Sequence, residues 1–159
     1  MMTHLSFEWS GPGPLASELR KPLTGISIDA FYPAWGPDTV TLLRSDGTGL
    51  KLFSRMHDVA ERLEVGVLNF ELVLEPSGTG TVLQISPSFS AGSVASKLVI
   101  HEADTTAESG LAITASDGNE IIVVASAGPC HLAVGGVPSS IPHLFEPEYP
   151  LDQYVRVPV

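Results

Sequence analysis

The side chains in this sequence that could bind a metal ion are its five histidines and the carboxylates beside them. The densest group is His101, Glu102 and Asp104, at the end of an apolar run typical of a β-strand. Alternate strand residues face opposite ways, so His101 and Asp104 can meet only if the chain turns there. No His-x-His, His-Glu-x-x-His or Cys-x-x-Cys motif is present. We therefore predict no metal site and no cofactor. The five histidines are His4, His57, His101, His131 and His143.

Cys130 is the single cysteine and precedes His131. A thiol and an imidazole can act as a nucleophile and its base. Neighbouring strand residues point to opposite faces, so these two could not exchange a proton directly. Free cysteine is among the most buried residue types, and we interpret Cys130 as buried and inert. No Gly-x-Ser-x-Gly elbow or glycine-rich phosphate loop occurs, so we predict no catalytic residue.

Four aromatic residues could line a ligand pocket: Phe31, Tyr32, Trp9 and Trp35. Aromatic side chains of β-proteins more often fill the core, and we interpret these four as core residues.

Negative charge is concentrated in the last third of the chain. The net charge is −10 over 159 residues, and residues 98–155 contain eight carboxylates but no Lys or Arg before Arg156. Such a field repels nucleic acid and anionic membranes and attracts cations. We therefore predict a basic protein partner, and neither nucleic acid nor membrane as a partner.

The carboxylates of this region would speed association with a positively charged partner and repel a negatively charged one. Two tyrosines near the C-terminus would add apolar anchors, because Tyr is enriched at interface hot spots. The alternative is a solvated acidic face that only keeps the protein soluble. The predicted partner-binding residues are Glu102, Asp104, Glu108, Asp117, Glu120, Glu146, Glu148, Tyr149, Asp152 and Tyr154.

The elements that must position these side chains are short, alternating runs rich in Val, Ile, Leu, Phe and Thr. Gly, Pro, Ser, Asp and Asn fill the intervals, as turns require. This pattern predicts one all-β domain over 1–159, an antiparallel sandwich or barrel of roughly 8–10 strands. The predicted strands cover 5–9, 25–32, 39–44, 49–55, 64–75, 80–86, 96–102, 111–116, 120–126 and 131–135.

Two tight hairpin turns are predicted at Ser45-Asp46-Gly47 and Ser116-Asp117-Gly118. They lie 71 residues apart, close to half the chain. A duplicated half-sandwich would explain the spacing, but independent use of a favoured turn is the simpler interpretation.

Residues 56–64 (MHDVAERLE) are the one predicted helix, because Met56, Val59, Ala60 and Leu63 share a face at helical spacing. The next strand then changes its apolar face between Val67 and Leu68. Either that strand is covered on both sides, or a bulge near Val67 shifts its register.

Proline is frequent near the C-terminus: residues 129–158 hold six of the 13 prolines. Proline interrupts helices and central strands, so 136–159 is predicted to be an extended strap on the surface. Its segment LDQYVRV (151–157) alternates well enough to join a sheet edge. Phe145 and Leu151 are the expected anchors of the strap.

Mean hydropathy is +0.22, but the apolar runs are far shorter than the about 20 residues of a membrane-spanning helix. The first residues lack the basic and apolar regions of a signal peptide. One cysteine rules out an internal disulfide framework. Together these features predict a cytoplasmic protein.

The arrangement GLAITASDGNEIIVVAS…FEPEYPLDQY (110–126 and 145–154) resembles the C-terminal part of small uncharacterised bacterial proteins. It is similar in character to immunity proteins, which are compact, acidic, intracellular inhibitors of a cognate toxin. The resemblance implies a non-enzymatic binding module that occludes a basic toxin or effector. Two alternatives remain: a ligand-binding or hydrolytic β-barrel with a pocket using His101, Glu102 or His131, and an accessory subunit of a larger assembly.

Overall fold

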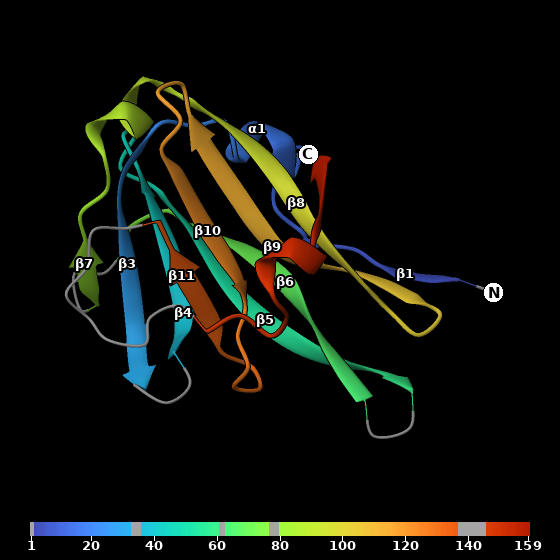
Figure 1. The fold of residues 1–159 in the computed structure, drawn as a ribbon. Coiled ribbons are helices and arrows are strands. Elements are labelled where there is room, and N and C mark those ends of the chain that lie inside the picture. The colour runs from blue at the N-terminus through green and yellow to red at the C-terminus, as the bar shows by residue number, and fades with distance from the viewer. Residues whose placement is uncertain (1, 33–35, 61–62, 77–79, 137–145) are drawn as a thin grey trace.

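Residues 2–32, 36–60, 63–76, 80–136 and 146–159 are described in the computed structural model. Over these residues the chain forms two six-stranded, mostly antiparallel sheets, and neither closes into a barrel (Figure 1). The predicted all-β fold is confirmed, and of the two predicted architectures the chain adopts the sandwich. A pocket inside a barrel, one of the alternatives raised by the sequence, therefore has no counterpart in the described sheets.

The first sheet has the strand order β2, β6, β5, β4, β3, β7. Its strands are β2 (Glu8–Trp9), β3 (Leu23–Tyr32), β4 (Gly36–Arg44), β5 (Gly49–Ala60), β6 (Leu63–Val73) and β7 (Thr81–Leu83). The second sheet has the order β11, β10, β9, β8, β12, and β1 pairs with β9 in parallel. Its strands are β1 (Thr3–Leu5), β8 (Ser93–Glu102), β9 (Thr105–Ala115), β10 (Glu120–Ala125), β11 (Leu132–Gly135) and β12 (Val155–Pro158).

Helical segments are few and short in the described residues: α1 (Leu15–Glu18), η1 (Pro87–Ala91) and η2 (Leu151–Gln153). None of the helices described has the length and apolar character needed to cross a membrane.

The two sheets repeat one topology. Four consecutive strands form an antiparallel meander in each sheet, β3 to β6 and β8 to β11. The following strand then pairs with the first strand of its own meander, β7 with β3 and β12 with β8. A short helical segment precedes each meander, α1 in one case and η1 in the other. The repeat in topology favours a duplicated half-sandwich over independent use of one turn.

Both predicted hairpin turns are confirmed, and their geometry matches. Asp46 and Asp117 each accept a hydrogen bond from the backbone N–H two residues later, at 2.9 and 3.1 Å. Gly47 and Gly118 follow them with φ of 87° and 89°, a conformation that costs glycine little. The equivalent turns join β4 to β5 and β9 to β10.

The predicted helix over 56–64 is wrong, because β5 continues to Ala60 and β6 begins at Leu63. Met56 pairs with Gly66 and Asp58 with Glu64 across this long hairpin. The ladder hydrogen bonds of this hairpin outweigh a helical pattern barely two turns long, which is too short to be stable alone. Residues 61 and 62 lie outside the described part of the chain.

The apolar core lies between the sheets and includes Leu50, Leu52, Leu68, Leu111 and Ile113, each at most 1% exposed. The face change in β6 does not come from a bulge, because pairing with β5 is regular from Gly49–Val73 to Asp58–Glu64. All of residues 65–70 are buried instead. Leu68 belongs to the inter-sheet core, while Val65 and Val67 belong to a second apolar cluster with Leu98, Ala112 and Tyr154.

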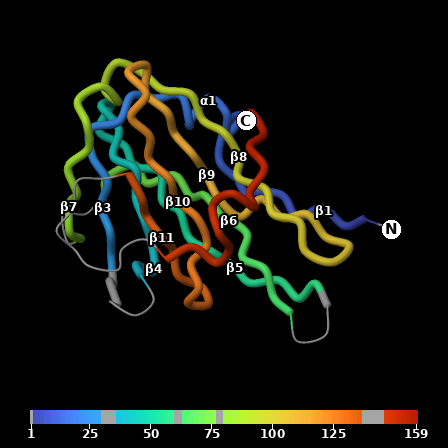
Figure 2. The backbone as a smooth tube through the Cα atoms, in the orientation of Figure 1, coloured from blue at the N-terminus to red at the C-terminus, as the bar shows by residue number. Residues whose placement is uncertain are grey.

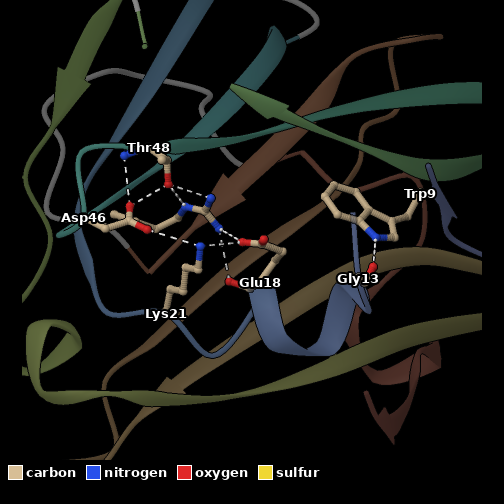
Figure 3. Close-up of polar contacts among 7 residues, drawn as sticks. Trp9, Gly13, Glu18, Lys21, Asp46 and Thr48 are labelled. Atoms are coloured by element: carbon tan, nitrogen blue, oxygen red, sulfur yellow. Dashed lines mark hydrogen bonds and ion pairs between the residues drawn. The ribbon is translucent and has the colours of Figure 1, made fainter. Parts of the chain in front are cut away.

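A buried arginine, Arg44, joins α1 to the β4–β5 turn through contacts with Glu18 and Thr48, both labelled in Figure 3. Arg44 is 3% exposed, and its guanidinium donates to Glu18 Oε2 at 2.8 Å and to Thr48 Oγ1 at 2.7 Å. Lys21 completes the cluster with contacts of 3.1 Å to Glu18 and 3.2 Å to Asp46. Burial opposes ionisation of Glu18, but hydrogen bonds from the two cations hold its pKa below the usual value. This cluster is therefore structural.

Trp9 packs against the inter-sheet core, as predicted, and its indole N–H donates to the Gly13 carbonyl at 2.9 Å (Figure 3). Trp35 and the side chains of Phe31 and Tyr32 lie outside the described part of the structure.

The C-terminal strap is described over residues 146–159 and lies against the second sheet, shown in red in Figure 2. Its last part forms β12 and pairs with the edge strand β8, which confirms the predicted edge pairing. Leu151 is 40% exposed, so it is not the anchor that we expected. Tyr154, at 8% exposed, anchors the strap instead. Phe145, the other expected anchor, lies outside the described residues.

Candidate functional site

An acidic cleft of about 400 Å³ opens between the end of the β5–β6 hairpin and the β10–β11 connection. The hairpin and the connection occupy equivalent positions in the two repeats, and the strap contributes Glu148. The lining residues in the described chain include three carboxylates and neither Lys nor Arg. They are Met56, Asp58, Leu63, Glu64, Ser126, Ala127 and Glu148.

The cleft exists because the inward face of the hairpin changes from apolar to polar. Along β5, Leu50 and Leu52 are core residues, and the same face continues with Ser54, Met56 and Asp58. Along β6 the corresponding face passes from Leu68 through Gly66 to Glu64. At this end of the sandwich the hairpin therefore presents Ser54, Asp58 and Glu64 where apolar residues stand further along the same face.

Gly66 brings β6 close to the strap. A Cβ atom at this position would lie 2.5 Å from Ala125 Cβ and 3.2 Å from Glu148 Oε2, so a larger residue would collide with the second sheet. Its N–H donates to Glu148 Oε2 at 3.3 Å, and its carbonyl accepts from the buried Ser109 hydroxyl. Glycine in a strand interior often marks such a close approach.

Glu148 is the most perturbed carboxyl of the cleft. Burial, together with the negative charges of Glu102 and Glu64, raises its pKa to about 7. The hydrogen bond from the Gly66 N–H acts in the opposite direction but is weaker. A carboxyl that is partly protonated at neutral pH, in a cleft and among other carboxylates, is a physical marker of a functional site.

Two tyrosines pack beside Glu148. The rings of Tyr149 and Tyr154 meet edge to face, with centroids 6.3 Å apart and an interplanar angle of 81°. Burial raises the pKa of the Tyr149 hydroxyl, and the charges of Glu148 and Glu102 add to this effect. Both tyrosines belong to or pack on the second apolar cluster, so they fasten the strap and support Glu148.

Of the predicted partner-binding residues, the structure brings together Glu102, Glu148, Tyr149 and Tyr154. Three of the other six, Glu108, Asp117 and Glu120, have hydrogen-bond or ion-pair partners of their own. Asp117 lies in the β9–β10 turn, where it bonds Asn119, and Glu120 next to that turn pairs with Arg156 at 2.7 Å. The side chains of Asp104, Glu146 and Asp152 are exposed.

Glu108 is buried and accepts a network of hydrogen bonds that joins β1 to β9. It accepts from the Phe7 N–H at 2.8 Å, His4 Nε2 at 2.9 Å and Lys97 Nζ at 3.0 Å. Burial alone would raise the pKa of Glu108, but these donors hold it below the ordinary value. The other ring nitrogen of His4 contacts the Thr106 hydroxyl. Hydroxyl, imidazole and carboxylate are thus aligned as in a catalytic triad, but Lys97 neutralises the carboxylate and Thr106 is buried. We interpret the network as structural.

In the described part of the chain, no group of three or more His, Cys, Asp or Glu could hold a metal ion. His101 is exposed, and His131 lies 2.8 Å from Asp38, an ion pair that joins β11 to β4 when the imidazole is protonated. His143 is outside the described residues.

Cys130 is exposed, so the prediction of a buried thiol is wrong. It lies in the turn between β10 and β11, not on the strand, and has a φ of 61°. Connecting turns lie on the protein surface, which accounts for the exposure of this thiol.

Sequence reasoning missed Asp58, Glu64, Ser54 and Gly66 as site residues. The predicted helix over 56–64 includes Asp58 and Glu64 and so conceals that they pair across a hairpin. The available signals were the glycine inside a strand and the change of apolar face one residue later.

A larger groove of about 600 Å³ lies over β2, β5 and β6, beside Phe53, Arg55 and Glu71. The Arg55 guanidinium lies 5.9 Å from the centre of the Phe53 ring. Because both signs of charge line this groove, it has no clear electrostatic preference, and the acidic cleft is the better-defined candidate.

The comparisons with known proteins leave the function of the cleft to be argued from its geometry: no family model, curated protein or solved structure matches this chain.

Proposed function

We propose that this protein is a non-enzymatic, cytoplasmic binding module that recognises a basic protein, in the manner of an immunity-type inhibitor. One observation carries the proposal: the acidic cleft is lined by three carboxylates and, among the described lining residues, by no Lys or Arg. The cleft replaces the dispersed acidic third of the chain as the proposed contact surface.

The electrostatics of the cleft favour a positively charged occupant. Burial disfavours ionisation of Glu148, and the negative charges of Glu102 and Glu64 disfavour it as well. A cation placed among these groups would relieve the repulsion, and the charge of the whole chain would steer it inward. Inhibition would follow by occlusion, with the acidic end of the sandwich covering a cationic active site of the partner.

The experiment compares two triple variants that remove equal charge. The cleft variant carries Asp58→Asn, Glu64→Gln and Glu148→Gln, and the control variant carries Asp104→Asn, Glu146→Gln and Asp152→Asn, all at exposed positions outside the cleft lining. Each is used as bait in affinity capture from the native cell, and stoichiometric partners are identified.

We expect a basic partner that wild type and control retain and the cleft variant loses. Its association should slow as salt rises, because screening weakens charge steering. The proposal fails if both triple variants capture the partner equally, or if the retained partner is acidic or neutral. Circular dichroism of both variants establishes that they are folded.

A second candidate, a hydrolytic enzyme, is favoured by the raised pKa of Glu148. A carboxyl that titrates near neutral pH beside other carboxylates is suited to general acid catalysis. Turnover of ester or glycoside substrates that is lost with Glu148→Gln, without any stoichiometric partner, would favour this candidate. An accessory subunit would instead be captured in a complex whose assembly survives the cleft variant.

A further inference from the structure

We infer, as an extension of the proposed function, that the acidic cleft receives one arginine side chain of the basic partner. The guanidinium displaces the proton that Glu148 carries when the cleft is empty, and that proton passes to solvent.

The lining of the cleft matches the two parts of an arginine side chain. Asp58, Glu64 and Glu148 offer carboxylate oxygens to the charged head, whereas Met56 and Leu63 offer apolar surface to the methylene stem. Arginine buries its stem along apolar surface while its head makes polar contacts. A small inorganic cation would leave the two apolar side chains without a role, and the described residues contain no metal-binding group.

A buried hydroxyl next to the cleft lacks a hydrogen-bond partner in the described part of the chain, which is an observation independent of the carboxylates. Ser54 is 5% exposed, and its Oγ has no hydrogen-bond partner among the described residues. Ser54 lies on the same face of β5 as Met56 and Asp58. Its Oγ and Glu148 Oε2 both lie close to Gly66, at 2.8 and 3.2 Å from the point that a Cβ atom on that residue would occupy. A buried polar atom without a partner is costly, so an N–H group from the occupant would stabilise the site.

Arginine suits this site better than lysine. The guanidinium has five N–H donors in a plane and can bond carboxylates and a hydroxyl on different sides at once. It is also more weakly hydrated than an ammonium, so entry into a partly buried cleft costs less desolvation free energy.

Proton displacement follows from the groups that face Glu148 on every neighbouring element. Asp58 comes from β5, Glu64 from β6 and Glu102 from β8, and the strap adds Tyr149 and Tyr154. None of these side chains carries positive charge, so the empty cleft favours neutral Glu148. With a guanidinium in place the ionised form is favoured, and binding and proton release are linked.

The test uses three probes: the acetyl N-methylamides of arginine, of citrulline, which has nearly the same shape but is neutral, and of lysine, which is charged but differs in shape. Binding is followed by NMR through the side-chain carboxyl resonances of the full-length protein, from pH 5.5 to 8.5. We expect the arginine probe to bind about tenfold more tightly at pH 8.5 than at pH 5.5. This ratio corresponds to a pKa of Glu148 that is lowered by about one unit on binding. The citrulline probe should not bind.

Two single variants of the strap provide the matched comparison. Glu148→Gln should remove the pH dependence of arginine binding, whereas the exposed neighbour Glu146→Gln should leave it unchanged. Backbone spectra identical to wild type show that either variant is folded.

The inference is overturned if the citrulline probe binds as well as arginine, if lysine binds more tightly, or if arginine binds with no pH dependence. No binding of the arginine probe would also overturn it. In each case the proposed function stands if the cleft variant still loses the basic partner. It falls only if the cleft and control variants capture the partner equally, or if the partner is not basic.

Discussion

Replacing Glu148 by Gln should remove a pH-dependent loss of stability that this carboxyl imposes on the fold. The pKa of Glu148 is raised in the folded chain from an ordinary 4.5 to about 7. The folded state therefore binds more protons than the unfolded state between these values. Its free energy of unfolding falls as pH rises through that window, and it is level above about pH 7 to 8.

The size of the effect follows from the pKa difference. Each pKa unit corresponds to about 1.36 kcal/mol, which sets an upper limit near 3 kcal/mol for the full difference. Solvent reaches part of the Glu148 side chain, and screening reduces this figure to on the order of 2 kcal/mol. Gln keeps an oxygen that can accept from the Gly66 N–H but does not ionise.

The assay is urea denaturation of wild type, Glu148→Gln and Glu146→Gln at pH 5, 6, 7 and 8 and constant ionic strength. The advantage of Glu148→Gln over wild type should grow by about 2 kcal/mol from pH 5 to 8, and Glu146→Gln should follow wild type. Carboxyls whose folded pKa is lowered, such as Glu108 and Glu120, lose their stabilising contribution only below about pH 4.5. Parallel curves for wild type and Glu148→Gln over this range would refute the reasoning.

Two further predictions concern the structural cluster and the thiol. Arg44→Met should lower the free energy of unfolding by about 3 kcal/mol or more, because it leaves Glu18 without its buried partner; a loss below about 1 kcal/mol in chemical denaturation would contradict the structural role of this cluster. Cys130 should be labelled completely by a thiol reagent in the native state without a change in circular dichroism, and protection until unfolding would show that the thiol is buried.

The sequence alone determined the features that depend on neighbouring residues. Alternating apolar runs predicted a β-protein, and Asp-Gly at positions 46–47 and 117–118 predicted two turns whose geometry now matches. The alternation of apolar and polar residues in 151–157 predicted that the strap joins a sheet edge, as β12 does. These features are accessible because strand periodicity and turn conformation are largely local properties.

Features that depend on which strands pair and pack together required the tertiary structure. The first half of β9, residues 105–110, is polar in sequence but fully buried, because Glu108 and Ser109 find partners on β1, β8 and β6. Residues 56–60 form a strand because their ladder partners are on β6.

The candidate site shows the same division. Glu148 stood out in the sequence as part of an acidic, proline-rich segment, but its neighbours Glu64 and Glu102 are 84 and 46 residues away along the chain. Burial and repulsion among carboxylates act through space, so the raised pKa of Glu148 arises only when two sheets and the strap meet. The sequence determined how much negative charge this protein carries, and the fold decided where that charge is left uncompensated.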